Sequence, residues 1–425
     1  MRHCEGGKRY DTAAVITVGC RLNQAESDSL RGRLIRAGIA VSPYRLNGRL
    51  LDLSTVSRIY INTCAVTRQA ERSSLAEIRR ACRLQPKPWV VVLGCFAEKA
   101  PERLKRIAGV NEVWTNLKKQ RLIAGQIPTP VRSRALLKVQ DGCDRHCGYC
   151  LVSYLRGKPV SLPAPQVVEQ FQSLVCAGFQ EIVLTGLNLG RYEHNGMDLA
   201  GLLNALLKKP GDFRIRLSSL EPDLFTERLL EMIADSKVCA HFHIPLQSGD
   251  DRILALMGRR YTVKKYDHLI SQILMSRPDV CIGADVIVGF PGEDDESFKR
   301  TMIYLSSSTL SYFHVFPYSL RLGTPAAQFG DPIPQGEKTE RVGILRQLSQ
   351  KKRLEFARRF VGDVRQVIVE PNLKALTDNY LRLSCPDLRG KEYQPGRMAE
   401  MKIELAGDKL IGSCQRANFM EEICL

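Results

Sequence analysis

Long apolar runs are missing from this sequence of 425 residues. The longest candidates, such as residues 89–97, have the length of a strand, whereas a membrane-spanning helix needs about 20 apolar residues. The first ten residues carry charge with no apolar core behind them, so no signal peptide is expected. These absences predict a soluble, cytoplasmic protein that does not use a membrane as a partner.

Tryptophan is also scarce, with 2 residues, and neither an internal repeat nor a low-complexity tract is visible. The chain is nevertheless 44% hydrophobic and long enough for two to four domains at roughly 100–200 residues each. A mini-protein and a disordered chain are therefore excluded.

Basic residues outnumber acidic ones by 62 to 45, which gives a net charge of +17. Residues 1–135 hold 25 basic and 10 acidic residues, a net of +15, while residues 136–361 have +3 and residues 362–425 have −1. A basic surplus favours a polyanionic partner. The first third is the region expected to attract it.

The first third alternates short β-branched runs, at residues 15–18, 58–61 and 89–93, with helical patterns. One helical face carries Leu30 and Leu34 and ends at Gly38. This alternation is typical of an open parallel α/β sheet, and we assign it to a domain over residues 8–125. The Pro-containing stretch at 126–133 is a predicted linker.

The middle of the chain repeats this alternation on a larger scale, with expected strands at 135–139, 181–184, 214–217, 241–244, 280–288 and 312–316. About six βα units predict a complete or partial (βα) barrel over residues 135–361, with functional residues at the C-terminal strand ends. A charged helix is expected at 338–359. The strand-like runs at 364–369, 380–383 and 401–405 predict a small all-β barrel over residues 362–425.

The sharpest local signal is the spacing Cys-x3-Cys-x2-Cys formed by Cys143, Cys147 and Cys150. Three thiolates in one loop can bind three irons of a 4Fe–4S cluster and leave the fourth iron open to another ligand. A zinc site that includes His146 is the alternative. Closed zinc sites, however, usually draw ligands from two separated clusters, and His146 is adjacent to Cys147.

This spacing, with Tyr149 directly before the last cysteine, resembles the signature of the radical S-adenosylmethionine (SAM) enzymes. The resemblance implies that the open iron binds SAM. One electron from the cluster then cleaves SAM to methionine and a 5′-deoxyadenosyl radical, chemistry that the cofactors supply and the protein orients.

Three further cysteines, Cys20, Cys64 and Cys95, each follow a predicted strand of the first domain. The ends of parallel strands share one edge of an open sheet, where ligand sites form, so these residues are expected to converge on a second cluster. The alternative is three buried cysteines that act as small hydrophobic side chains.

The motifs around these cysteines, at residues 17–27, 62–67 and 94–97, resemble those of the methylthiotransferase family. Within that family, residues 214–222, 243–249 and 314–327 most resemble the branch that thiomethylates N6-threonylcarbamoyladenosine at tRNA position 37, next to the anticodon. The C-terminal residues, notably 377–382, resemble the family's TRAM domain. The resemblance implies two 4Fe–4S clusters: one SAM methylates a sulfur carried on the auxiliary cluster of the first domain, and the radical from a second SAM activates carbon 2 of the adenine.

By the same resemblance, Tyr149 and a set of residues after barrel strands bind SAM, namely Gly186, Asn188, Glu221 and Gln247. Arg156 and Arg382 are implied in substrate binding. Two residues near the first cluster motif depart from the family pattern: Ser153 stands where proline is usual and Val160 where arginine is usual. No role is assigned to His243, and the cysteines at 4, 82, 176, 239, 281, 385, 414 and 424 are interpreted as structural or incidental.

The expected partner is the anticodon loop of tRNA, whose unstacked bases proteins can reach. Arg382, Arg389 and Lys391 form the expected basic patch of the tail. The resemblance also implies an electron donor such as a flavodoxin or a ferredoxin, and the sulfur donor is unknown. Three alternatives stay open: thiomethylation of isopentenyladenosine in tRNA, thiomethylation of a ribosomal-protein aspartate, and an RNA-binding or electron-transfer module whose clusters are structural or redox centres.

Overall fold

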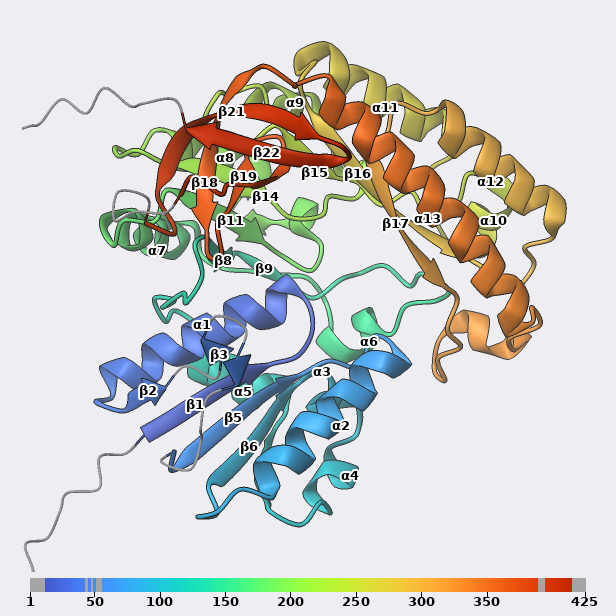
Figure 1. The fold of residues 1–425 in the computed structure, drawn as a ribbon. Helices are drawn as coiled ribbons and strands as arrows, with labels where there is room; N and C mark the ends of the chain where they lie inside the picture. Colours follow the sequence, from blue (N-terminus) through green and yellow to red (C-terminus); the bar gives the residue numbers. More distant parts are fainter. Residues whose placement is uncertain (1–11, 43–44, 47–48, 51–55, 389–393, 415–425) are drawn as a thin grey trace, which may run out of the picture. The chain divides into compact units, whose positions relative to one another are not determined.

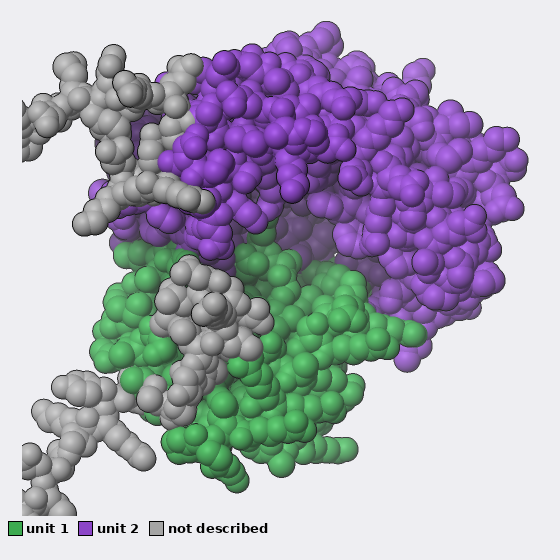
Figure 2. All heavy atoms as spheres, in the orientation of Figure 1, with its two compact units in different colours: residues 1–131, 151–158 green, residues 132–150, 159–425 purple. Residues whose placement is uncertain are grey.

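The computed structural model describes residues 12–42, 45–46, 49–50, 56–388 and 394–414. The chain divides into two compact units (Figure 2): unit 1 comprises residues 1–131 and 151–158, and unit 2 comprises residues 132–150 and 159–425. The division after Val131 falls inside the predicted linker. Residue 8, the predicted start of the first domain, lies outside the described residues.

Unit 1 is the open parallel sheet that the sequence predicts (Figure 1), with its strands in the order β2-β1-β5-β6-β7. Its strands are β1 (Thr12–Thr17), β2 (Ala40–Ser42), β5 (Arg58–Thr63), β6 (Trp89–Gly94) and β7 (Val110–Trp114), beside a hairpin of β3 (Arg45–Leu46) and β4 (Arg49–Leu50). Its helices are α1 (Arg21–Arg36), α2 (Arg68–Cys82), α3 (Cys95–Lys99), α4 (Pro101–Lys105), α5 (Asn116–Ile123) and α6 (Val152–Arg156).

Helices cover both faces of this sheet because side chains alternate along each strand. Ile59 and Ile61 of β5 pack with residues of α2, α3 and α4 in one apolar cluster. Tyr60, between them, packs with α1 and α5 in another. The strands are thus buried on both faces, as is usual for parallel sheets. A ligand site can therefore form only at an edge, and in open α/β sheets it forms at the carboxyl ends of the strands.

The segment at residues 151–158, which holds α6, packs in unit 1 although it directly follows the Cys143–Cys150 loop in sequence. Leu155 joins the apolar cluster on the α2 face, and its carbonyl accepts a hydrogen bond from Asn116 Nδ2 at 2.5 Å. The sequence motifs assign this segment to the barrel. Its packing partners instead place it with the first sheet.

Unit 2 contains six parallel barrel strands, in two hydrogen-bonded groups ordered β14-β11-β8 and β15-β16-β17. The parallel bridge from Ile215 to Val238 and the bond from Leu220 N to His243 O join β14 to β15. The strands are β8 (Ala135–Lys138), β11 (Glu181–Thr185), β14 (Arg214–Leu217), β15 (His241–His243), β16 (Cys281–Val288) and β17 (Tyr312–Pro317). The predicted partial barrel is confirmed.

Helices surround the outer face of these strands (Figure 1) and share one apolar core with them. They are α7 (Ala164–Cys176), α8 (Leu199–Leu207), α9 (Glu227–Met232), α10 (Asp251–Leu256), α11 (Val263–Ser276), α12 (Asp295–Ser307) and α13 (Gln335–Arg358). Short elements complete the unit: η1 (Leu189–Arg191), η2 (Pro222–Leu224), η3 (Pro325–Phe329) and the pairs β9 (Gln140–Asp141) with β10 (Val160–Ser161) and β12 (Glu193–His194) with β13 (Met197–Asp198).

The C-terminal residues form a closed barrel with the strand order β18-β19-β20-β22-β21, as predicted. Its strands are β18 (Val364–Glu370), β19 (Lys374–Thr377), β20 (Arg382–Ser384), β21 (Met398–Ala406) and β22 (Lys409–Cys414). The strand predicted from Tyr380 begins only at Arg382, because Tyr380 has a φ of +69°. The turn here is closed by a hydrogen bond of 2.8 Å from Leu381 N to Thr377 Oγ1.

A buried ion-pair network ties this small barrel to the larger one. Arg214 and Arg216 both bond Glu181, at 2.8 and 2.7 Å, and all three side chains are at least 95% buried. Their other nitrogens donate to backbone carbonyls of the C-terminal barrel, including Leu376 O at 3.0 Å and Thr377 O at 3.1 Å. The C-terminal barrel is therefore a fixed part of unit 2, held by the larger barrel's own strands.

Among the described residues, no helix combines the length and the apolar character needed to cross a membrane. The other cysteines with described side chains differ in their burial. Cys239, Cys281 and Cys385 are buried, Cys82 is half-buried and Cys176 is exposed. The side chains at 4, 414 and 424 lie outside the described residues. The structural role predicted for the buried cysteines is consistent with their packing, since burial raises the pKa of Cys239 to about 11 and that of Cys281 to about 12.

Candidate functional site

The structure places the three cysteines after the neighbouring parallel strands β1, β5 and β6: Cys64 and Cys95 follow β5 and β6 directly, and Cys20 follows β1 after Val18 and Gly19. The three cysteines therefore share the carboxyl edge of the sheet, as the sequence predicts. Cys20 precedes the first turn of α1, and Cys95 is the first residue of α3. Each thiol thus sits where a strand turns into a connection, and three residues distant in sequence come together.

The three thiols are close enough to influence one another's ionisation. Burial raises the pKa of Cys20 and raises that of Cys64 to about 11, and repulsion from the thiol of Cys95 adds to both shifts. Cys64 and Cys95 are buried, whereas Cys20 is partly exposed to solvent. The Cys20 sulfur is nevertheless surrounded by protein atoms, which is why its pKa is raised. A cationic group shared by the three sulfurs would relieve this repulsion, which is what an iron–sulfur core supplies.

Two glycines permit this close approach of the strand ends. Gly19 has a φ of +121°, and a Cβ built there would lie 2.8 Å from the Cβ of Cys64. Gly94 has a φ of +97°, and its Cβ would lie 2.4 Å from Asn62 Oδ1. Any other residue would be both strained and obstructed at these positions.

The second triad lies in the loop after β9 of unit 2. A turn closed by the 3.0 Å bond from Cys150 N to Cys147 O folds the loop back. Cys143 Sγ accepts from Arg145 N at 3.4 Å and from Asn188 Nδ2 at 3.7 Å. Burial raises the pKa of Cys143, and the neighbouring thiol of Cys147 adds to the shift. Asn188, predicted to contact SAM, thus lies at the cysteine loop.

Arg259 organises this second site, and the sequence reasoning missed it. Its Nη1 lies 3.4 Å from both Cys147 Sγ and the Tyr149 hydroxyl, and its Nη2 pairs with Glu221. Two of the predicted SAM contacts, Tyr149 and Glu221, therefore share one buried guanidinium. No spacing rule could have identified Arg259, because it follows the cysteine loop by more than a hundred residues and is preceded by an ordinary helix.

Two predicted SAM contacts have buried oxygens with no hydrogen-bond partner among the described residues. They are Asn188 Oδ1 and Gln247 Oε1. Gln247 also has a φ of +73°, an uncommon conformation for a residue with a side chain. Buried polar atoms without partners are rare and indicate a missing polar ligand. Because both atoms are acceptors, they fit the donors of SAM, its amino group and its ribose hydroxyls.

Each cysteine triad offers three sulfur donors. In the described part of the chain, no group of three His, Cys, Asp or Glu side chains is placed to hold one metal ion. A 4Fe–4S cluster makes a different demand from a single ion, because each thiolate binds a different iron.

The remaining predicted residues lie in different surroundings. Gly186 follows β11, and its N–H donates to Ser218 Oγ at 3.4 Å. Arg156 lies on α6 of unit 1, with its side chain 1% exposed. Arg382 is exposed and lies over the Tyr380 ring, with 5.7 Å from its guanidinium carbon to the ring centroid. Its predicted neighbours in the basic patch, Arg389 and Lys391, lie outside the described residues.

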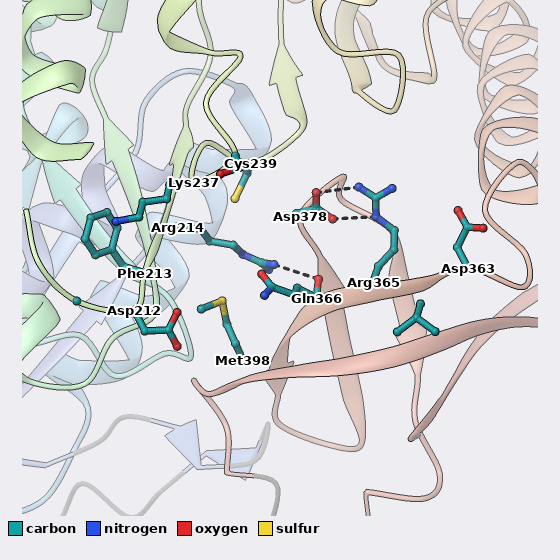
Figure 3. A pocket seen from close by; sticks show the side chains of 13 residues that line it. Asp212, Phe213, Arg214, Lys237, Cys239, Asp363, Arg365, Gln366, Asp378 and Met398 are labelled. Carbon is teal, nitrogen blue, oxygen red and sulfur yellow. Dashed lines mark hydrogen bonds and ion pairs between the residues drawn. The ribbon is translucent and has the colours of Figure 1, made fainter. Parts of the chain in front are cut away.

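Unit 2 contains two cavities beside the C-terminal barrel. The larger, of about 640 Å³, is lined by residues of both barrels. Figure 3 shows Arg214 bonded to Gln366 and Arg365 paired with Asp378 in its wall. Because its lining mixes both charges and its arginines are already paired, we assign it no ligand. The second, of about 430 Å³, is lined by apolar, basic and acidic residues, and the basic and aromatic ones include Arg353, Tyr380, Arg382 and Lys409 beside Glu370 and Asp408.

His243, to which the sequence assigned no role, joins a hydrogen-bonded chain on three barrel strands. Its Nδ1 lies 2.9 Å from Ser219 Oγ and its Nε2 lies 3.1 Å from Asp285 Oδ1. His314 lies beside it, with 5.9 Å between the ring centroids. These side chains are exposed or half-buried, so this face of the strands is polar and accessible.

Comparison with known proteins now identifies the class. Residues 137–305 match the model described as "Radical SAM superfamily", and residues 12–116 match "Uncharacterized protein family UPF0004". A radical SAM methyltransferase structure, TsrM from Kitasatospora setae, shares the fold with a TM-score of 0.57, at 14% identity over 74% of this chain and 77% of that one. The protein is a radical SAM enzyme.

Full-length relatives narrow the class to one family. The chain is 38% identical to the threonylcarbamoyladenosine tRNA methylthiotransferase MtaB of Aquifex aeolicus, over 92% of this chain and 99% of the relative. It is 33% identical to that of Bacillus subtilis, over 93% and 94%. A tRNA-2-methylthio-N(6)-dimethylallyladenosine synthase of Thermotoga petrophila is 31% identical over 92% and 94%. The chain belongs to the radical SAM methylthiotransferase family.

Proposed function

We propose that this enzyme adds a methylthio group to carbon 2 of N6-threonylcarbamoyladenosine at position 37 of tRNA, beside the anticodon. The observation that carries this proposal is the likeness to the Aquifex aeolicus relative over 99% of its length, under a name that specifies this substrate. The two regions that hold a cysteine triad lie within residues 12–116 and 137–305, which match the two family models.

The family's cofactors are 4Fe–4S clusters and SAM, and two sets of residues in this chain suit two clusters. Cys143, Cys147 and Cys150 are proposed to hold the cluster that binds SAM. Cys20, Cys64 and Cys95 are proposed to hold the auxiliary cluster. When bound, these groups supply the SAM-derived radical and the sulfur of the methylthio group.

The chain's own contribution at the SAM site is to bind and orient. Asn188 and Gln247 offer buried oxygens that need donors, which the amino group and ribose hydroxyls of SAM can supply. Arg259 fixes Glu221 and the Tyr149 hydroxyl in place and keeps positive charge beside Cys147 Sγ. Gly186 is proposed to bring backbone close to the amino acid part of SAM.

Recognition of tRNA is proposed to rest mainly on the charge of unit 1, since residues 1–135 carry a net of +15. Phosphate neutralisation makes affinity fall with salt, at roughly −0.7 to −0.9 in log K against log salt per phosphate contacted. In the C-terminal barrel, Arg382, whose guanidinium lies over the Tyr380 ring, offers an exposed cation for the loop.

Isopentenyladenosine in tRNA is the nearest alternative substrate, because the Thermotoga petrophila relative is named for the dimethylallyl nucleoside at 31% identity. The ribosomal-protein aspartate is the less favoured alternative, because both sets of named relatives act on tRNA by name. We also expect a flavodoxin or ferredoxin as the electron donor, and cytoplasmic tRNA as the pool from which the substrate is drawn.

The test is single-turnover reaction of the reconstituted enzyme with two purified tRNAs, one bearing threonylcarbamoyladenosine and one bearing isopentenyladenosine at position 37. Mass spectrometry of the digested nucleosides should show the 2-methylthio product from the first tRNA at least tenfold in excess of that from the second. A product only from the second tRNA would assign the chain to the other branch. The Cys143→Ala variant, which lacks one ligand of the SAM cluster, is the inactive control.

A further inference from the structure

A set of buried charges lies beside the cysteine triad of unit 1. Arg156 Nε donates to Cys95 Sγ at 3.3 Å, while its Nη1 pairs with Glu26 at 2.5 Å and its Nη2 donates to Asn23 Oδ1 at 2.8 Å. Lys119 Nζ pairs with the same Glu26 at 2.9 Å. The side chains of Lys119 and Glu26 are fully buried, and that of Arg156 is 1% exposed.

These buried groups place full charges beside the cysteines, away from water. Arg156 and Lys119 are both cationic, and both pair with Glu26. A buried charge acts strongly on its neighbours, because little water screens it.

The cysteine triad would be anionic when it holds a cluster. Three thiolates carry three negative charges, and an oxidised 4Fe–4S core carries two positive ones, so the whole group would have a net charge of −1. A buried cation that donates to one of its sulfurs, as Arg156 does to Cys95, would stabilise this charge. The potential of such a cluster depends on its net charge, on hydrogen bonds to its sulfurs and on its exposure to solvent, and Arg156 acts on the first two.

We propose that Arg156 is a positioning residue for the auxiliary cluster, which orients the Cys95 sulfur and sets the reduction potential of the cluster by charge and hydrogen bonding. The inference rests on the proposed function, in that it assumes a 4Fe–4S cluster at Cys20, Cys64 and Cys95. It gives Arg156 a task different from the substrate contact implied by family resemblance, because that contact would require the guanidinium to leave Glu26 and become exposed.

The local structure holds Arg156 in this position. It is the last residue of α6, which Gly157 ends with a φ of +75°. Leu155 packs in the apolar core of unit 1 and its carbonyl is fixed by Asn116. Asn23, which accepts from Arg156, also lies 3.8 Å from Cys20 Sγ and donates to Thr63 O at 2.9 Å. The same side chains therefore join Arg156 to all three cysteine-bearing strand ends.

The experiment uses the full-length chain with Cys143, Cys147 and Cys150 replaced by alanine, so that only the auxiliary cluster is loaded. In this background, R156Q, R156K, E26Q and the control K158Q are reconstituted and titrated with dithionite under electron paramagnetic resonance. One electron from dithionite takes the core from the 2+ to the 1+ state. Lys158 suits the control because it is a basic, exposed residue of the same segment.

R156Q should lower the potential and cut the reduced-to-oxidised ratio at a fixed potential at least tenfold, ~59 mV for a one-electron couple. E26Q should change the ratio in the opposite direction, because it removes a negative charge. R156K should stay nearer to the unsubstituted background than R156Q does, and K158Q should match that background.

A merely structural role for Arg156 would give no opposed shifts. If R156Q fails to fold, E26Q decides the matter, since its shift has a defined sign: a raised potential supports the inference, and an unchanged or lowered potential overturns it. Equal potentials in all variants, or shifts of one sign in R156Q and E26Q, would overturn the inference while leaving the cluster assignment intact. A background chain that binds no iron would instead overturn the proposed auxiliary site itself.

Discussion

The two cysteine triads are built in opposite ways. In unit 2, Cys143, Cys147 and Cys150 (the loop triad) come from one loop, so local spacing alone nearly fixes their arrangement. In unit 1, Cys20, Cys64 and Cys95 (the sheet-edge triad) each follow a different strand of one sheet, and the site exists only when the sheet is formed. The comparison teaches that similar ligand sets can have very different dependence on the fold around them.

The environments of the sulfurs differ as well. At Cys143, Cys147 and Cys150, the Arg259 guanidinium lies 3.4 Å from Cys147 Sγ and shares its charge with Glu221. Cys20, Cys64 and Cys95 lie beside two buried cations, Arg156 and Lys119, that both pair with Glu26. The first arrangement suits a site that must also admit SAM. The second suits an anionic group enclosed by protein.

The largest expected effect concerns the stability of unit 2, and it tests whether the loop triad still binds iron when that stability is lowered. Replacing Glu181 by Gln removes the partner of two buried arginines and should lower the free energy of unfolding of unit 2 by about 3–5 kcal/mol. The folded fraction should still bind iron at the loop triad. Chemical denaturation with iron analysis checks both points, and the exposed Glu231→Gln on α9 is the matched control.

The same variant carries a pH signature. Arg216 and Arg214 hold the pKa of Glu181 well below its usual range despite the opposing effect of burial. The ionised carboxylate therefore stabilises the folded state above the unfolded pKa of about 4.3, and this contribution is lost as pH falls below it. The stability gap between wild type and Glu181→Gln should shrink from pH 7 to pH 3. A gap that widens on acidification would contradict the ion-pair assignment.

The next effect tests how strongly the sheet-edge triad depends on its fold. Gly94→Ala should destabilise unit 1 by about 2–5 kcal/mol, from a positive φ and from overlap with Asn62 and Thr63. It should lose the iron of the auxiliary site while SAM cleavage continues. Gly38→Ala is the control, because its φ is +77° but its Cβ would meet nothing within 4 Å. Equal iron loss in both variants would show that close approach at Gly94 is unimportant.

A smaller effect is expected at the loop triad from Arg259→Gln. The change leaves Glu221 unpaired and removes the donor to Cys147 Sγ, so SAM cleavage should slow at least tenfold, about 1.4 kcal/mol. Four irons should remain at the auxiliary site. The adjacent exposed Arg260→Gln should cleave SAM at the wild-type rate. Unchanged cleavage in Arg259→Gln would remove this residue from the site.

The smallest effect concerns tRNA. Arg382→Gln should lower affinity only a few-fold and reduce the salt slope by less than about 1, because most of the positive charge lies in residues 1–135. Filter binding at several salt concentrations measures both quantities. Deleting residues 362–425 would be a poorer test, since it strips Arg214 and Arg216 of their carbonyl partners. A salt slope that falls by several units in Arg382→Gln would place the main phosphate contacts on the C-terminal barrel.

Much of this could be predicted from the sequence, where periodicity or spacing carried the information. The strand runs before Cys20, Cys64 and Cys95 are short and β-branched, and parallel strands bring their ends to one edge. The six barrel strands and the charged helix α13 also followed from periodicity. The closed C-terminal barrel was predicted too, although the strand expected at Tyr380 starts two residues later.

What could not be predicted depends on contacts distant in sequence. A five-residue helix such as α6 shows no pattern that reveals which unit it packs on, and the cysteine loop before it suggested the wrong neighbour. Arg214 and Arg216 alternate with apolar residues, as on a strand with a solvated face, yet they are buried against Glu181. Asn23 and Glu26 did give a signal: two polar residues three positions apart on the helix after Cys20.

The measurement that tests the central claim most directly is the iron content and SAM cleavage of the Cys20, Cys64 and Cys95 triple alanine variant after anaerobic reconstitution. If the two triads hold separate clusters, the wild type should bind about eight irons per chain and the variant about four. The variant should still cleave SAM on reduction but form no methylthio product. A variant that binds about eight irons, or that no longer cleaves SAM, would contradict the division of labour between the two sites.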